Sequence, residues 1–355
     1  MTNLILIGFG KVGQSLAEML ELRSTELRED YGVDLKVVAI VDRGGAAVSK
    51  TGIDITDALK VKRPAGSVSA MKDSGKPHLS ALEVLEEVDG DIVVEATSTN
   101  LENGEPGLTH IKKALSLGRH IVTTNKGPLA LSLPYLIDLS CKNKVSLCFS
   151  GAVGGAMPIL EFAKRCLYGD KIESIRGVLN GTTNYILWRV AEKHVSLSEA
   201  LKEARELGYT EENILYDLDG LDTACKLVIL ANSVMNRKVS LRDVEVKGIR
   251  EISLQEVLNA KKEGFAVRLI GSINERITVS PEKFPVRDPL CVDSASNAVV
   301  FTCTCSGQHL LIGRGAGSKE TASSVVRDIV NIAQECKLSS SHRKRTGEYA
   351  FSNPF

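Results

Sequence analysis

The segment from Glu211 to Lys226, EENILYDLDGLDTACK, holds the residues with the clearest chemical potential. It contains several carboxylates and then a single cation, Lys226. Asp222 and Lys226 are four residues apart, so they share one face of a helix. Spacing alone favours a solvated surface pair that contributes about 0.3–0.5 kcal/mol. The residues from Thr223 to Leu230 are otherwise apolar or small, however, and a half-buried lysine in such a helix has a tunable pKa and can transfer a proton.

The same segment predicts where its helix begins. Asp219 can act as the N-cap, with Gly220 and Leu221 in the first turn and Asp222 at the third position, where a carboxylate meets free backbone N–H groups. The preceding residues show neither a helical nor a strand period, so they are expected to form a loop.

A glycine-rich turn near the N-terminus predicts a dinucleotide site. The motif GFGKVG follows a short apolar strand, Asn3 to Ile7, and opens a helix, which is the context that the dinucleotide fingerprint requires. Gly8 allows the tight turn, Gly10 lets a pyrophosphate approach the backbone, and Gly13 lets helix and strand pack closely. The residues predicted to bind the cofactor here are Gly8, Phe9, Gly10, Lys11, Val12 and Gly13.

The end of the second predicted strand, Lys36 to Val41, bears on the choice of cofactor. Asp42 follows this strand, and an acid there bonds the ribose hydroxyls of NAD. Arg43 comes next, and an arginine there can hold the 2′-phosphate of NADP. The two residues point to different cofactors, so the sequence leaves NAD and NADP open.

Two further strands end in residues that suit ligand binding. The apolar strand Asp91 to Ala96 ends at Thr97 and Ser98, and the strand His120 to Thr123 leads to Lys126. Ligands of open α/β sheets bind at the carboxyl ends of the strands. Lys126 is therefore expected near the nicotinamide or a substrate carboxylate, although a simple loop cation directly before a Gly-Pro break is the alternative.

The order of these elements predicts an α/β protein with two domains. Residues 1–149, rejoined by 318–336, are expected to form a Rossmann-type doubly wound parallel sheet. Residues 150–317 are expected to form a second α/β domain with a mixed sheet, which binds substrate and forms the dimer. The tail, residues 337–355, is expected to be loosely held.

Composition excludes several classes of partner. Lysine plus arginine (44) balance aspartate plus glutamate (44) in the 355 residues, so nothing indicates nucleic acid or an anionic membrane. No apolar run approaches the ~18 residues of a membrane span, and no signal peptide is evident, so a cytoplasmic location is expected. The eight cysteines form no Cys-x-x-Cys motif and are expected to be reduced. Cys303 and Cys305 alternate along one predicted strand and are expected to face the core.

Several motifs together resemble the homoserine dehydrogenase family. They occur in that family's order and are GFGKVG, TTNKGPLA, SGAVGGAMPIL, NGTTNYIL and GYTEENILYDLDGLDTACK. The resemblance implies NAD(P)-dependent interconversion of L-homoserine and L-aspartate 4-semialdehyde, in the biosynthesis of threonine, methionine and isoleucine. It also implies a homodimer.

The resemblance assigns roles to individual residues. Lys226 matches the proton donor, Asp222 the acid that orients it and contacts substrate, and Lys126 a second active-site lysine. Gly317 matches a late cofactor contact. The residues that match the family's substrate-binding positions are Glu211, Asp217, Asp222 and Thr182. Those that match positions whose backbone carbonyls hold a sodium ion are Ser150, Val153, Gly155 and Met157.

Two departures from the family pattern and two alternatives accompany this interpretation. The sequence ends too soon for the C-terminal regulatory domain of many members, so feedback by threonine is not expected, and it has Asp219 where the family often has asparagine. One alternative is another Rossmann amino-acid or semialdehyde dehydrogenase. The phosphorylating kind needs an activated cysteine, which Cys141 and Cys148 do not readily supply. The other alternative is a non-catalytic NAD(P)-binding regulator.

Overall fold

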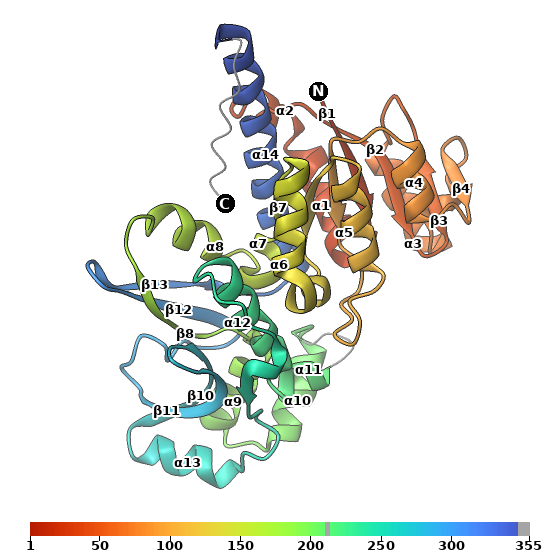
Figure 1. Ribbon diagram of the computed structural model, residues 1–355. Helices are drawn as coiled ribbons and strands as arrows, with labels where there is room; N and C mark the ends of the chain where they lie inside the picture. Colours follow the sequence, from red (N-terminus) through yellow and green to blue (C-terminus); the bar gives the residue numbers. More distant parts are fainter. Residues whose placement is uncertain (210–213, 347–355) are drawn as a thin grey trace. The chain divides into compact units, whose positions relative to one another are not determined.

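The computed structural model describes residues 1–209 and 214–346, which fall into two compact units (Figure 1). The first unit is Met1–Ala152 together with the chain from Thr321 onward, and the second is Val153–Glu320. In the described part of the chain, no helix combines the length and the apolar character needed to cross a membrane.

The first unit is built on a mainly parallel sheet with the strand order β4-β3-β2-β1-β5-β6-β7. Its strands are β1 (Thr2–Ile7), β2 (Leu35–Asp42), β3 (Gly45–Val48), β4 (Gly75–Pro77), β5 (Ile92–Glu95), β6 (His120–Thr123) and β7 (Leu147–Cys148). The neighbouring strands β2, β1, β5, β6 and β7 pair in parallel, and β3 and β4 add an antiparallel edge beside β2. Because β1 lies between β2 and β5, the chain changes direction across the sheet there, and ligands of such sheets bind beside that point. The predicted Rossmann-type fold is confirmed.

Helices cover both faces of this sheet. On one face, α1 (Lys11–Leu22), α2 (Ser24–Glu29), α3 (Ile55–Ala65) and α14 (Ser318–Thr346) share a core with Leu4 and Leu6 of β1. On the other face, α4 (Ala81–Glu87), α5 (Gly107–Ser116) and α6 (Lys126–Asn143) pack on Ile5 and Ile7. Alternate side chains of β1 thus enter two different cores, which explains its continuous apolar run. The last helix continues to Thr346, so residues 337–346 of the predicted tail are helical.

The second unit contains the predicted mixed sheet, with the strand order β13-β12-β8-β10-β11-β9. Its strands are β8 (Ile172–Val178), β9 (Val244–Val246), β10 (Phe265–Ile273), β11 (Ile277–Pro285), β12 (Ser296–Cys303) and β13 (Gly307–Arg314). Only β9 and β11 pair in parallel. Its longer helices are α9 (Gly181–Lys193), α10 (Leu197–Glu206), α12 (Leu221–Ser233) and α13 (Leu254–Lys262). A Cβ atom at Gly271 of β10 would lie 2.9 Å from Thr223, so α12 packs tightly on the sheet.

After the glycine-rich segment the chain forms a short helix, α8 (Ile159–Glu161), which continues as a π-helical turn (Phe162–Cys166). One prediction of local structure is wrong. Cys303 is buried as expected, but Cys305 is exposed, because β12 ends at Cys303 and the chain turns before β13.

Candidate active site

Lys226 lies on α12 and is more deeply buried than predicted, with 5% of the residue exposed. Its Nζ lies 2.8 Å from Asp222 Oδ2 and donates to the carbonyl oxygen of Leu179 at 2.7 Å. An ammonium group has three hydrogens to donate. The third has no partner within hydrogen-bond distance among the described residues, so it is available to a ligand.

Asn180 joins the acids of this site, a role that the sequence analysis missed. Its Nδ2 donates to Asp217 Oδ1 at 2.6 Å and to Asp222 Oδ2 at 2.9 Å. Its Oδ1 accepts the backbone N–H of Thr183 and caps α9. One amide therefore holds two buried carboxylates together while ending a helix. The position of Asn180 just after a strand, where ligands bind, was the available signal.

The helix start predicted at Asp219 is wrong. Gly220, with φ of +82°, precedes α12 and makes no side-chain cap. Asp219 is turned outward instead and lies 3.1 Å from Arg250. The residues before it form a short helix, α11 (Ile214–Leu218), rather than a loop. The left-handed conformation of Gly220 lets the chain turn between two helices, so no capping side chain is required there. Glu211 lies outside the described residues.

Other predicted residues of the second unit have mainly structural contacts. Thr182 lies in the first turn of α9, where its hydroxyl donates to the carbonyl oxygen of Tyr209 at 2.6 Å. Gly317 has φ of +123°, and a Cβ atom there would lie 2.2 Å from Glu320 Oε2. Gly155 has φ of +55°, and its Cβ atom would lie 2.5 Å from Gly315. Both glycines are therefore required by the backbone, whatever they bind.

The three glycines of GFGKVG occupy three different environments in the first unit. Gly8 has φ of +99°, and a Cβ atom there would lie 2.4 Å from the carbonyl oxygen of Ala96. A Cβ atom at Gly13 would lie 2.2 Å from the carbonyl oxygen of Gly8, so helix and strand touch there. Gly10 precedes α1 and has open space around its Cβ position. This opening at the N-terminus of α1 is where an anionic pyrophosphate fits.

The carboxylate of Asp42 already accepts hydrogen bonds from other residues of the first unit. It accepts hydrogen bonds from Lys62 Nζ and Val68 N on one oxygen, and from Ser67 Oγ and Gly44 N on the other. Burial alone raises the pKa of Asp42, but the hydrogen bonds from Lys62, Ser67, Val68 and Gly44 outweigh it, so the pKa lies below its ordinary value. Four accepted bonds use the capacity of a carboxylate, so a ribose diol must displace one of them.

Arg43, by contrast, is exposed and forms no hydrogen bond or ion pair with the described residues. Thr97 and Ser98 follow β5 as predicted. Lys126 is not a loop residue: it is the first residue of α6, whose N-cap Asn125 accepts the N–H of Gly127 at 3.1 Å. An asparagine cap is sufficient to start a helix before a Gly-Pro pair, since proline fits the first turn.

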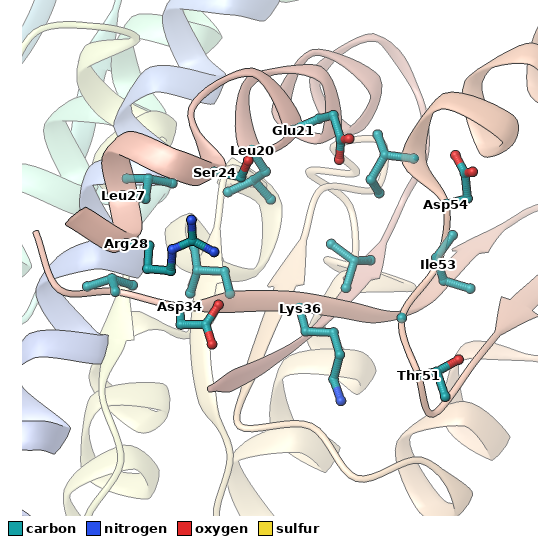
Figure 2. A pocket seen from close by; sticks show the side chains of 15 residues that line it. Leu20, Glu21, Ser24, Leu27, Arg28, Asp34, Lys36, Thr51, Ile53 and Asp54 are labelled. Atoms are coloured by element: carbon teal, nitrogen blue, oxygen red, sulfur yellow. The ribbon is translucent and has the colours of Figure 1, made fainter. Parts of the chain in front are cut away.

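A cavity of about 330 Å³ lies elsewhere in the first unit, beside the amino end of β2 (Figure 2). Aliphatic side chains such as Leu20, Leu27 and Ile53 line it, with Arg28 and Asp34 among its charged residues. None of the predicted site residues lines this cavity. Nor do the described residues include a cluster of three or more His, Cys, Asp or Glu side chains placed to hold a metal.

Comparisons with known proteins point to a single family over nearly the whole chain. A family model described as homoserine dehydrogenase matches residues 158–330, and one described as its NAD-binding domain matches residues 8–150. The homoserine dehydrogenase of Methanocaldococcus jannaschii is 41% identical over 336 residues, covering 94% of this chain and 99% of that protein. The NAD(+)-dependent homoserine dehydrogenase of Pseudomonas canavaninivorans is 33% identical and covers 96% and 98%. A solved hyperthermophilic archaeal homoserine dehydrogenase in complex with NADPH has a TM-score of 0.82 at 31% identity, covering 94% and 98%.

Proposed function

The chain belongs to the homoserine dehydrogenase family, and from this premise we propose how its own residues share the work of the reaction. It is an NAD(P)-dependent oxidoreductase that interconverts L-homoserine and L-aspartate 4-semialdehyde. Family membership disfavours both alternatives, a different Rossmann dehydrogenase and a non-catalytic regulator.

Lys226 is the proposed proton donor and acceptor. When bound, the nicotinamide cofactor would supply the hydride for the aldehyde carbon, and the aldehyde oxygen would then need a proton. Lys226 donates a proton to that oxygen, and in the reverse direction its neutral amine takes the proton back. The observation that carries this proposal is the buried ammonium with one unused hydrogen, held in place by Asp222 and Leu179.

The remaining charged residues are proposed to bind the two charged groups of the amino acid. Asp217 and Asp222, which Asn180 holds together, attract the substrate ammonium group, with Glu211 as a further acid. Thr182 lies in the first turn of α9, close in sequence to Asn180. Lys126 at the start of α6 attracts the substrate carboxylate or the cofactor.

The direct test is oxidation of NADPH and NADH by the purified enzyme with L-aspartate 4-semialdehyde. Turnover with this substrate, and NADP⁺ or NAD⁺ reduction with L-homoserine, are expected. Cofactor binding without turnover would support the regulator, and turnover with another amino alcohol but not homoserine would support a different dehydrogenase.

We further propose that the enzyme binds NADP more tightly than NAD. Asp42, the acid that favours NAD, already accepts four hydrogen bonds, whereas the Arg43 guanidinium is exposed without a partner among the described residues. Arg43→Ala should weaken NADP binding about 10–100-fold, the loss of a charge-assisted phosphate contact, and leave NAD unchanged. Fluorescence titration with both cofactors measures this.

Arg63→Ala is the matched control for that experiment. Arg63 lies on α3 and its guanidinium pairs with Glu18 at 3.1 Å, so its removal should affect neither cofactor. Equal weakening of NAD and NADP by Arg43→Ala would remove Arg43 from the 2′-phosphate role.

A homodimer through the second unit is also proposed. Leu310 and Ile312 of the edge strand β13 are 42% and 56% exposed. They pair with Val300 and Ala298 of β12, so these side chains share one face of the sheet. The opposite face is the one on which α12 packs, at Gly271. The middle of this face is buried, because Ala298 lies in a core cluster, so the exposed apolar surface is the edge formed by Leu310 and Ile312. Such an edge suits a second copy of the chain.

Light scattering tests this proposal. The wild type should show twice the chain mass of 38.3 kDa, and Ile312→Lys should shift the mass toward the monomer. Leu207→Lys at the C-cap of α10, which replaces another exposed leucine, should remain dimeric. A monomeric wild type at micromolar concentration would rule the dimer out.

Sodium binding stays a prediction. The carbonyl oxygens of Ser150, Val153, Gly155 and Met157 are the hard ligands that such a cation takes. The Met157 carbonyl already accepts the N–H of Ile159 at 2.9 Å, which leaves its second lone pair for a cation. Binding can be followed by sodium NMR on the cofactor-free enzyme.

A further inference from the structure

Glu95 is a carboxylate that the proposed reaction does not use. It ends β5, is fully buried, and accepts the N–H of Thr97 at 3.1 Å, the hydroxyl of Thr97, and the hydroxyl of Thr123 at 3.1 Å. Its only neighbour that can carry positive charge within 4 Å, among the described residues, is His110, whose Nδ1 lies at 3.8 Å and makes no hydrogen bond. Burying a carboxylate without Lys or Arg is costly for folding, so its presence requires an explanation.

The partners of Glu95 lead directly to the start of α6. Asn125 Nδ2 donates to Thr97 Oγ1 at 3.1 Å, and Asn125 N donates to Thr123 Oγ1 at 3.1 Å. Asn125 is also the N-cap of α6, and Lys126 is the first residue of that helix. Through Glu95, the loop after β5 and the helix that begins with Lys126 are therefore held as one hydrogen-bonded set.

Gly107, the first residue of α5, packs closely against this hydrogen-bonded set. A Cβ atom on Gly107 would lie 2.5 Å from Asn125 Nδ2 and 3.1 Å from Glu95 Oε2. The φ angle of Gly107 is not positive, so its backbone would accept another residue. What excludes a side chain at Gly107 is thus above all the Asn125 amide, with Glu95 Oε2 and Pro128 Cγ both 3.1 Å from the added Cβ atom.

We propose that Glu95 is a positioning residue for cofactor binding, which holds Thr97 and Lys126 in a fixed relation without contacting the cofactor. This inference rests on the proposed cofactor role of Thr97, Ser98 and Lys126. Its effect is geometric: a shift of about 1 Å in a binding group can cost up to about 100-fold in rate. A fully satisfied buried polar set gives a single arrangement of these loops, which an apolar core would not specify.

Gly107→Ala tests the proposal without removing any polar group. Gly107 is the first residue of α5 and its φ is not positive, so alanine can adopt the backbone there. Its methyl group displaces the buried Asn125 side chain, so the Tm should fall. We expect the KM for NADP to rise about tenfold or more while kcat at saturating cofactor changes much less, and it is the KM that tests the proposal. An unchanged KM would overturn the proposal.

Glu95→Gln and Glu95→Ala separate geometry from charge. The glutamine oxygen can accept both bonds from Thr97, and its amide can donate to Thr123 Oγ1, whose own hydrogen can go to the Glu95 carbonyl oxygen at 3.0 Å. Glu95→Gln should therefore stay within about threefold of wild type in cofactor KM, and Glu95→Ala should resemble Gly107→Ala. Equal losses in Glu95→Gln and Glu95→Ala would overturn the geometric role.

Two further variants identify the cause of a negative result. Ser98→Ala and Lys126→Ala test the cofactor role separately from the Glu95 set, which includes the Thr97 hydroxyl. If neither alters the KM for NADP, the proposed cofactor contacts are wrong and the inference is wrong with them. If they alter it but Gly107→Ala and Glu95→Ala do not, only the inference fails. Asn232→Ala is the control for general destabilisation, because Asn232 is a buried asparagine of the second unit bonded to Val239. It should lower the Tm without changing cofactor KM.

Discussion

Lys226→Arg should lower kcat for homoserine oxidation about 10²–10⁴-fold, the usual range for the loss of a general acid–base group. Arginine keeps the positive charge beside Asp222 but does not readily release a proton. Substrate binding should therefore be better preserved in Lys226→Arg than in Lys226→Ala. Steady-state kinetics in both directions, together with thermal melting of each variant, measure these effects.

Burial makes the alanine variant less decisive than the arginine variant. Removing one partner of a buried ion pair costs roughly 3–5 kcal/mol, so Lys226→Ala should lose stability as well as activity. Added methylamine should restore part of its kcat, because a small amine can enter the space and donate the proton. A Lys226→Arg enzyme that keeps most of its kcat would make the lysine an electrostatic element, and Lys126 or an ordered water the better candidate for the donor.

Lys261 offers a matched control for this substitution. Its Nζ also contacts a carboxylate, Glu192 at 3.0 Å, and a backbone carbonyl, Ala191 at 2.9 Å, but its side chain is 40% exposed. Lys261→Arg should leave both kcat and stability unchanged, since exposed pairs contribute little.

Gly10→Val should raise the Kd for NADPH about 100-fold or more and leave the fold intact. Every described glycine except Gly10 has either a positive φ or a neighbouring atom within 4 Å of the Cβ position. Neither backbone conformation nor internal packing therefore requires glycine at this position. A valine side chain would occupy the open space at the N-terminus of α1, where the pyrophosphate must approach the backbone.

Fluorescence titration with NADPH and circular dichroism test this prediction together. Gly13→Ala is the contrasting variant, because its Cβ atom would lie 2.2 Å from the Gly8 carbonyl oxygen and should destabilise the first unit. If Gly10→Val bound NADPH with wild-type affinity, the glycine turn would not be the pyrophosphate site.

Local spacing was enough to predict the features that depend on near neighbours. The strand, glycine turn and helix at the N-terminus follow one another directly, and alternation along β1 and the four-residue spacing of Asp222 and Lys226 are properties of single elements. The local predictions that failed, the cap at Asp219 and the loop before it, depended on which residue adopts a left-handed conformation. Gly220 does so because a second helix, α11, precedes it.

Only the tertiary structure could show which distant groups satisfy the buried charges. Asn180 donates hydrogen bonds to Asp217 and Asp222, which are 37 and 42 residues away in the sequence. The Asp42 carboxylate accepts hydrogen bonds from the segment between Lys62 and Val68. Glu95 accepts one from Thr123, 28 residues away. Glu95 meets Thr123 because the parallel strands β5 and β6 end at the same edge of their sheet. The partners of Asp42 and Asn180 come instead from helices and turns, which only the tertiary fold brings beside them. A sequence shows that a carboxylate ends a strand. Whether that carboxylate binds a ligand or is already occupied by its own chain is decided by what the fold places beside it.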